Sequence, residues 1–378
     1  MPVTKLIRQV LIIFPLLAIT VLSVSGQKNC GWESFSSFQE KYSREIKKSS
    51  IKDGENYLEK INFVDEKRGW ISGTNFTAAT TNGGKTWKIK RIEPAVVNEI
   101  YFADQSKGWH TLVSESSEVK IYQTLDGGKT WKYLKQISES FVVKSDPRVF
   151  GYVPTILKVR FINDDVVWSV GLKKVGDTMQ YAIWKTSDGG KTWETKYLSK
   201  DSVIQKTLEA SFIRLTEKRI IVSSNGLILL SEDNGESWQA TANLNVSKTA
   251  TPDFFKDFDF AEDTFVRAIT GINGKIFQSL DGGKTWLPHA LGMKNEDSYK
   301  FTNIKFSNRQ AGWIAGSQND GKTAAGIILS TTDGGNTWIQ AYRATAPEII
   351  ALSKTSKYLF AVGNNGLLLK YSIVDCLN

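Results

Sequence analysis

Four copies of the segment GGKTW carry the residue types of a phosphate-binding loop. Such loops hold nucleotide phosphates with backbone amides and a lysine amine, and they need a further glycine five positions before the glycine of Gly-Lys-Thr. The copies have that second glycine at Gly84, Gly128, Gly190 and Gly283, and the residues five positions earlier are Ala79, Gln123, Lys185 and Gln278. A binding loop is also normally built once in a chain. The segments therefore exclude a nucleotide-binding loop and predict a repeated turn.

Other side chains offer little catalytic chemistry. The chain has two histidines, His110 and His289, and no Cys/His cluster spaced as zinc ligands, so we expect neither a metal nor a cofactor. A glycoside hydrolase needs two carboxylates placed across a sugar. Acids are available in segments that we expect to be loops, at Asp146, Asp177, Glu296, Asp297 and Asp320. Because any protein surface carries such acids, the sequence favours a protein without catalytic residues. A carbohydrate-active protein, either glycan-binding or glycoside-hydrolysing, is the alternative.

The repeated turn belongs to a longer motif that covers most of the chain. The pattern S/T-x-D-x-G-x-T/S-W, called the box motif below, occurs six times. Its third position is Asn82, Asp126, Asp188, Asp233, Asp281 or Asp333, and its last position is Trp87, Trp131, Trp193, Trp238, Trp286 or Trp338. Successive tryptophans of the motif are 44, 62, 45, 48 and 52 residues apart. Periods in this range are typical of propellers and arrays.

An alternating apolar segment precedes each box motif, most clearly as INFVDEKRGWISG, IYFADQSKGWHTL and IKFSNRQAGWIAG. Alternation interrupted by short polar turns predicts antiparallel strands. Each unit of about 45 residues then consists of strands a, b, c and d, which together make a propeller blade. In the box motif, Asp accepts backbone hydrogen bonds, Gly supplies a positive φ and Trp begins strand d. We predict an all-β fold, a single β-propeller of seven four-stranded blades with the box motifs as c–d turns.

The box motif resembles the Asp box, or bacterial neuraminidase repeat, of known β-propellers. Its pairing with an F-x-D-x-x-x-G-W element is similar to the photosystem II assembly and stability factor family, over roughly Ile61 to Tyr371. This resemblance implies a propeller whose boxes lie away from the ligand-binding face. It does not decide the function, because Asp boxes occur in sialidases, other glycosidases, sorting receptors and assembly factors alike. Nothing in the sequence indicates a photosynthetic host, so the photosystem partner is not carried over to this chain.

The seventh blade lacks a strand of its own. Seven strand-a segments accompany only six box motifs, because the last unit ends after Gly366–Ile373 without a box or a strand d. The N-terminus could supply that strand, since Trp32 resembles the tryptophan that begins strand d elsewhere. Cys30 and Cys376 would then lie where the seventh box turn is missing, and we predict a Cys30–Cys376 disulfide that locks the ring. A short amphipathic helix is expected over Gln39–Ser50, although this segment could itself be the closing strand.

The N-terminus has the features of a secretory signal. Basic residues precede an apolar run from Val10 to Val24, and the small residues Ser25 and Gly26 follow it. An uncleaved anchor is the alternative, but the run is short for a membrane span. We therefore predict a secreted or periplasmic protein with no membrane span after cleavage. The predicted parts are a signal peptide over 1–26, a closing strand and short helix over 27–58, and the propeller over 59–378.

Binding is expected on the face opposite the box turns, where loops on a rigid scaffold usually acquire function. The segments read as irregular there include Lys135–Thr155, Gly171–Gln180 and Gly316–Ala325. Candidate binding residues, which would form a basic and aromatic rim, are Arg148, Tyr152, Lys173, Lys174 and Tyr299. We expect a monomer that binds a protein partner or, alternatively, a glycan. The formal net charge of +9 comes mostly from lysines on a solvated surface, and we expect no nucleic-acid partner.

Overall fold

The structure is a computed structural model of the chain. It describes residues 30–47, 58–73, 76–92, 96–113, 119–136, 156–163, 165–176, 178–200, 212–216, 218–224, 226–243, 254–319, 321, 323–344 and 348–376. The predicted signal peptide over 1–26 lies outside these residues. In the described part of the chain, no helix is both long and apolar enough to cross a membrane.

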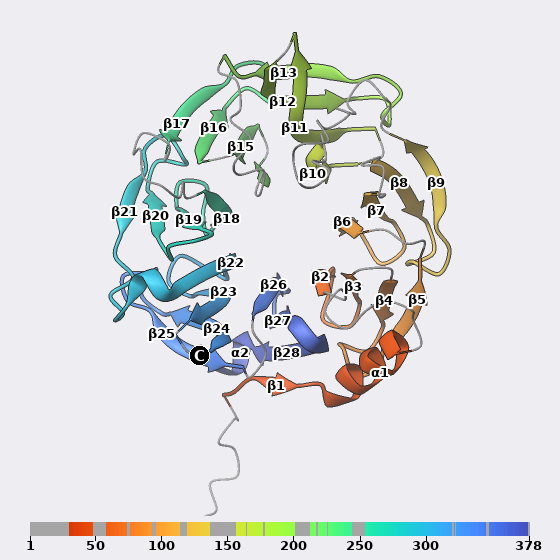
Figure 1. Cartoon of the computed structure of the whole chain (residues 1–378), viewed down its shortest axis with the longest axis vertical. Helices are drawn as coiled ribbons and strands as arrows, with labels where there is room; N and C mark the ends of the chain where they lie inside the picture. The colour runs from red at the N-terminus through yellow and green to blue at the C-terminus, as the bar shows by residue number, and fades with distance from the viewer. Residues whose placement is uncertain are drawn as a thin grey trace, which may run out of the picture.

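Seven antiparallel sheets of four strands are arranged as blades around a common axis (Figure 1). Blade 1 consists of β2 (Leu58–Phe63), β3 (Gly69–Gly73), β4 (Phe76–Thr80) and β5 (Lys88–Arg91). Blade 2 consists of β6 (Val96–Phe102), β7 (Gly108–Val113), β8 (Val119–Thr124) and β9 (Lys132–Gln136). Blade 3 consists of β10 (Ile156–Phe161), β11 (Val167–Val175), β12 (Thr178–Thr186) and β13 (Glu194–Leu198). Blade 4 consists of β14 (Phe212–Thr216), β15 (Arg219–Ser224), β16 (Leu227–Ser231) and β17 (Gln239–Asn243). Blade 5 consists of β18 (Phe255–Phe260), β19 (Val266–Thr270), β20 (Ile276–Ser279) and β21 (Leu287–His289). Blade 6 consists of β22 (Tyr299–Phe306), β23 (Gly312–Asn319), β24 (Ala324–Thr331) and β25 (Ile339–Arg343). Blade 7 consists of β26 (Ile349–Lys354), β27 (Tyr358–Gly363), β28 (Leu367–Ser372) and β1 (Glu33–Ser34). The predicted fold, an all-β propeller of seven four-stranded blades, is confirmed.

Besides the strands, the described residues contain the helices α1 (Ser36–Lys47) and α2 (Ile373–Cys376) and the 3-10 turns η3 (Glu296–Ser298) and η4 (Asn364–Gly366). η4 connects β27 to β28 within blade 7. In every blade the first strand lies nearest the axis and the last strand forms the outer edge (Figure 1). The six box motifs connect the third strand to the fourth in blades 1 to 6, as the repeat predicts.

The hydrophobic core lies between neighbouring blades. The ring of Trp70 in blade 1 stacks on the ring of Phe102 in blade 2, with centroids 3.4 Å apart. Phe360 in blade 7 stacks in the same way on Phe63 in blade 1, at 3.6 Å. Both pairs join the second strand of one blade to the innermost strand of the next. The tryptophan of the Gly-Trp element and the phenylalanine of the F-x-D element therefore form one inter-blade contact, which explains why they recur together.

The N-terminal segment closes the ring. β1 pairs antiparallel with β28, with Glu33 opposite Lys370 and Ser34 opposite Leu369, and so becomes the fourth strand of blade 7. α1 follows it along the outside of the ring (Figure 1). Phe38 and Tyr42, one helical turn apart, are buried in the core cluster between blades 7 and 1. The helix thus covers a seam that the short β1 strand alone would leave open.

Two segments that were expected to be irregular loops are strands instead. In blade 3, β11 and β12 pair as far as Val175 and Thr178, so most of Gly171–Gln180 is a long hairpin. In blade 6, β23 and β24 pair as far as Asn319 and Ala324, which shows the same for Gly316–Ala325. Gly and Lys are poorly represented in strands, but cross-strand pairing determines the structure here.

Candidate functional site

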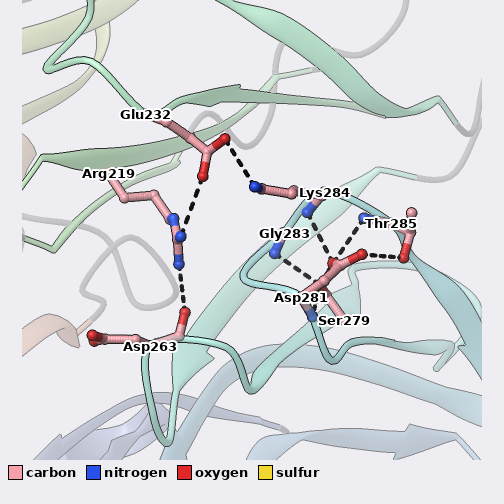
Figure 2. Close-up of polar contacts among 8 residues, drawn as sticks. All are labelled: Arg219, Glu232, Asp263, Ser279, Asp281, Gly283, Lys284 and Thr285. Carbon is pink, nitrogen blue, oxygen red and sulfur yellow. Dashed lines mark hydrogen bonds and ion pairs between the residues drawn. The ribbon is translucent and has the colours of Figure 1, made fainter.

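The box motif forms a turn that satisfies its own polar groups. In blade 5 the hydroxyl of Ser279 donates to Asp281 Oδ1 at 2.7 Å and accepts from the Gly283 amide at 2.7 Å. Thr285 donates its amide to Asp281 Oδ1 at 2.9 Å and its hydroxyl to Asp281 Oδ2 at 2.6 Å (Figure 2). Gly283 has φ +94°, a value that a side chain would strain. The carboxylate is therefore engaged inside the turn and is not presented to a ligand.

Hydrogen bonding also sets the acidity of these carboxylates. The hydroxyl at the seventh position of the motif, and then the amide of the same residue, lower the pKa of Asp126, Asp233 and Asp333 to about 2. The pKa of Asp188 is lowered for the same reason. At Asp281 partial burial opposes this effect, but the hydrogen bonds outweigh it and the pKa is again about 2. The box carboxylates are thus held ionised as turn residues.

Ion pairs link adjacent blades on the box face. Glu232 of blade 4 lies between Arg219 Nη2 at 3.3 Å and Lys284 Nζ of blade 5 at 3.1 Å. Arg219 also donates to the carbonyl oxygen of Asp263, at 2.6 Å (Figure 2). The turns between the first and second strands lie on this face too, because the Gly282 amide donates to the Thr264 carbonyl at 2.9 Å. The described contacts of this face are structural, which directs attention to the opposite one.

The innermost strands enclose a cavity of about 900 Å³ at the propeller axis. In six blades the innermost strand begins with a register shift, so that one residue is left unpaired with the second strand. Such bulges redirect side chains. The unpaired residues Glu59, Lys256, Thr302 and Ile350 all line the cavity. Since each innermost strand runs toward the box face, these residues lie at the opposite end of the channel.

Lysines and glutamates gather at this end of the channel. Lys60, Lys158 and Lys256 come from blades 1, 3 and 5, and Glu99 and Glu348 come from blades 2 and 7. Burial, followed by the nearby Lys60 amine, lowers the pKa of Lys158 to about 7. Burial also raises the pKa of Glu59, although Lys60, Lys158 and Lys256 oppose that shift. Opposed shifts of this kind in a cavity mark a candidate functional site.

Other polar residues of the channel hold the blades together. Asp257 Oδ2 of blade 5 accepts from the Ile304 amide at 3.0 Å and from Lys305 Nζ at 3.2 Å, both in blade 6. Asp259 Oδ2 accepts from the Phe306 amide at 2.8 Å. Asn62 Oδ1 likewise accepts from the Phe102 amide of the next blade, at 3.2 Å. These acceptors satisfy backbone donors of the neighbouring innermost strand and are structural.

The structure describes only some of the candidate rim residues. Arg148 and Tyr152 lie outside the described residues. Lys173 lies on the β11–β12 hairpin and donates to Thr195 Oγ1 at 3.3 Å, and the backbone of Lys174 follows it in β11. Tyr299 is only 3% exposed and packs against Phe301, so the expectation of an exposed aromatic there is wrong. Its position at the start of β22 places it in the core between blades 5 and 6.

The two cysteines lie beside each other at the edge of blade 7. The thiol of Cys30 donates to the Asp375 carbonyl at 3.4 Å. Burial and the neighbouring Cys30 thiol raise the pKa of Cys376 to about 11. Both are free thiols in this structure, so the disulfide stays a prediction.

The described histidine and acidic residues do not assemble a metal centre. His110 is buried between Tyr122 and Trp131, and burial lowers its pKa to about 3. It is therefore a neutral core residue. Within the described ranges, no group of three or more His, Cys, Asp or Glu residues could hold a metal ion.

Comparisons with known proteins point to one group of propellers. A family model described as "Photosynthesis system II assembly factor YCF48" matches residues 241–348. The photosystem II assembly protein Ycf48 of Thermosynechococcus vestitus is 24% identical over 319 residues, which cover 82% of this chain and 80% of that protein. The photosystem II assembly lipoprotein Ycf48 of a Nostoc species is 26% identical over 196 residues, 50% of this chain and 52% of that protein. A solved structure titled "YCF48 bound to D1 peptide" has a TM-score of 0.58 at 18% identity and covers 92% of this chain and 96% of its own. The similarity to photosystem II assembly factor propellers, predicted from the motifs, is confirmed.

Proposed function

From the premise that this chain is a seven-bladed propeller similar to the photosystem II assembly factors, we propose that it is a non-enzymatic protein-binding propeller. It binds a segment of a partner protein on the face opposite the box turns, and it acts as an assembly or interaction scaffold. The relatives support an assembly role through their names, and the YCF48 structure with a D1 peptide is an example of a similar fold that holds a peptide. The identity of that partner is not transferred to this chain.

One observation carries this proposal: the charged end of the axial channel lies away from the box turns. The box face is occupied by turn hydrogen bonds and by the ion pairs around Glu232. The channel end instead presents Lys60 and Lys158 to a cavity of about 900 Å³. A cavity with a few converging charged groups is suited to a protruding segment of another molecule. Lys173 and Lys174, with Arg148 and Tyr152, are proposed to extend this surface outward.

The proposed location is outside the cytoplasm, in the periplasm or secreted. The apolar run from Val10 to Val24 and the small residues after it support export. Relatives named as lipoproteins are consistent with an exported protein. Edman sequencing of the mature protein from its native host would test this, with a start at Gln27 expected. A cytoplasmic protein that retains residues 1–26 would contradict it.

Cross-linking in envelope extracts tests the binding face. The bait is the mature chain, and the variant Lys173→Glu/Lys174→Glu reverses two charges on the proposed face. Lys284→Glu reverses one charge on the box face and is the control. We expect one defined protein to be captured, with at least a tenfold loss in the double variant and no loss in the control. Equal capture by all three proteins would contradict the proposed face.

The carbohydrate-active alternative has its own test. A glycan array and a panel of fluorogenic glycosides should give no specific signal with the mature protein. Glu296 already accepts a hydrogen bond from the Gly292 amide at 2.8 Å, as a turn residue does. Hydrolysis that a single loop Asp→Asn or Glu→Gln change abolishes would overturn the protein-binding proposal.

A further inference from the structure

Three lysines from alternate blades converge at the propeller axis. Lys60, Lys158 and Lys256 belong to blades 1, 3 and 5 and line the same cavity. Lysines on a solvated rim would point outward, where water stabilises their charge. These three lie on the innermost strands, and each is partly buried. Their placement therefore needs an explanation other than solubility.

Equivalent positions of other blades show what this position does structurally. Asp257 in blade 5 and Asn303 in blade 6 follow the bulge of their strands in the same register as Lys60 and Lys158. Both are acceptors that satisfy the next blade: Asp257 accepts from the Ile304 amide at 3.0 Å, and Asn303 Oδ1 from the Leu352 amide at 3.0 Å. A lysine amine has no acceptor and cannot make this bond. In blades 1 and 3 this position therefore holds a cation in place of an inter-blade acceptor.

Lys60 and Lys158 line the same cavity, and Lys60 is close enough to lower the pKa of the Lys158 amine. Lys60 and Lys256 both disfavour a proton on Lys158, whereas Glu99 favours it. Two ammonium groups this close repel, and the repulsion is stronger in a cavity than in water. An anion between them would offset the repulsion and accept hydrogen bonds from both amines. The repulsion between the two amines thus favours the binding of an anion.

We propose that the axial channel is an oxyanion site, in which Lys60 and Lys158, with Lys256 nearby, receive a carboxylate or phosphate group from the face opposite the box turns. The same chemistry could come from an acidic side chain of a bound protein segment or from a free small anion. The first source rests on the proposed function; the second does not. The glutamates Glu59, Glu99 and Glu348 around the site would favour a ligand that also carries hydrogen-bond donors over a bare polyanion.

Calorimetry on the mature protein tests the site with four probes. They are inorganic phosphate, citrate, a peptide of alternating Gly and Asp, and its Gly–Asn counterpart as a neutral control. We expect at least one anionic probe to bind and the Gly–Asn peptide not to bind. Lys158→Met and Lys60→Met should each weaken that binding at least tenfold, and Lys284→Met on the box face should leave it unchanged. If none of the anionic probes binds, or if Lys158→Met and Lys60→Met bind within twofold of the parent, the proposal is wrong.

Thermal unfolding gives a second readout. Because Lys158→Met removes a repulsion, it should raise the midpoint temperature of the empty protein, and the anionic probe should raise the midpoint of the parent but not of the variant. A variant with a lowered midpoint that still gains stability from the anion would contradict the proposal. Should Lys158→Met fail to fold, Lys158→Gln and Lys60→Met carry the same comparison.

The probes separate the two sources of the anion. Binding of phosphate or citrate identifies a free anion, and binding of the acidic peptide alone identifies a protein-borne carboxylate. The outcomes also distinguish this inference from the proposed function. Anion binding without capture of any partner would contradict the function and support the site. The opposite outcome is capture of a partner that Lys158→Met and Lys60→Met do not affect, with no anion binding. That outcome would support the proposed function and contradict the anion site.

Discussion

The indole Nε1 of Trp70 donates a hydrogen bond of 2.9 Å to the carbonyl oxygen of Gly127, in the box turn of the following blade. The same indole stacks on Phe102 of that blade. One side chain thus fixes both the turn and the innermost strand of its neighbour. In blade 5 the corresponding side chain is Arg267, which donates to the carbonyl oxygen of Gly334 in the next box turn. The side chain at the Gly-Trp position therefore connects each of these blades to the next one, and it is a tryptophan in blade 1 but an arginine in blade 5.

Two substitutions at Trp70 should separate its hydrogen bond from its packing. Trp70→Phe keeps an aromatic ring but loses the donor, and we expect it to lower the free energy of unfolding by about 1 kcal/mol. Trp70→Ala also removes the stacked ring, and we expect a loss of about 3–5 kcal/mol. Urea unfolding followed by tryptophan fluorescence measures both. Leu287→Ala, at a side chain that is 60% exposed, is the control and should change little. Equal losses for the two Trp70 variants would show that packing contributes nothing there.

Arg267 should be essential to the contact between blades 5 and 6. It is 2% exposed, donates to the Gln278 side chain as well as to Gly334, and lies 4.5 Å from the Phe265 ring centroid. Burial lowers its pKa to about 10, so it remains charged at neutral pH. Arg267→Ala leaves the Gly334 carbonyl unsatisfied and opens a cavity, and we expect a loss of about 2–4 kcal/mol.

A neighbouring arginine supplies the control for this prediction. Arg309 also lies over the Phe265 ring, at 5.5 Å from its centroid, and its side chain is 58% exposed. Arg309→Ala should cost less than about 1 kcal/mol. Thermal denaturation of the two variants, side by side, measures the difference. Midpoint temperatures that fall equally in the two variants would contradict a special role of Arg267 in the contact between blades 5 and 6.

Acid should weaken the box turns. The folded pKa of Asp126, Asp233, Asp281 and Asp333 is about 2, below the value of about 3.9 expected in the unfolded chain. Their contribution to stability is therefore present above about pH 4 and is lost as the pH falls toward about 2. We expect the thermal midpoint of the parent to fall steeply across this range. Changing all four residues to Asn should flatten that fall.

The chain itself shows that Asn fits the motif. Asn82 in the first box accepts from the Thr86 amide at 2.9 Å and donates to the Thr86 hydroxyl at 2.8 Å. The fourfold variant should therefore fold at pH 7. A control with the same change of charge outside the boxes replaces Glu33, Glu40, Asp165 and Asp297 by amides. If this control flattens the profile as much, net charge rather than the box turns determines acid stability.

Oxidation of Cys30 and Cys376 should stabilise the ring. The chain-entropy expression for a loop of this length gives on the order of 5–6 kcal/mol as an upper figure. Non-reducing peptide mapping of protein from an oxidising compartment should find the Cys30–Cys376 pair, and a reductant should lower the midpoint temperature. Cys30→Ser/Cys376→Ser should show no such dependence on reductant. Two alkylatable thiols in the native protein would contradict the disulfide.

Most of the fold could be predicted because its determinants are local and repeated. Each box motif encodes its own turn. The sequence has seven strand-a segments but six box motifs, which indicates that the seventh blade takes its fourth strand from elsewhere. β1 fills that place although it has only two residues, because Trp32 packs on Tyr371 and α1 anchors it. The hairpin of blade 3 could not be predicted in the same way, because Gly and Lys have low strand propensity when the pairing of the strands is not known.

The channel could not be predicted in the same way. Lys60, Lys158 and Lys256 are far apart in the chain and occupy unlike local sequences, and only the ring brings them to one axis. A signal was nevertheless present: a polar residue at the start of strand a, where an apolar residue would fit a buried strand. Five of the seven first strands carry a phenylalanine at one register position, and aligning the strands by that residue places the three lysines near one another. Loop segments were the expected place for binding residues, whereas the converging charges lie inside the ring.

The pairing of Glu33 with Lys370 joins the two ends of the described chain. Blade 1 is synthesised early but cannot contact blade 7 until the strands of blade 7 have been synthesised, so this non-local contact forms late. A product truncated before β28 would expose an unpaired strand edge and the apolar side of α1, which favour aggregation and degradation. Ring closure thus acts as a check on synthesis: β1 finds its partner strand only in a chain that includes β28.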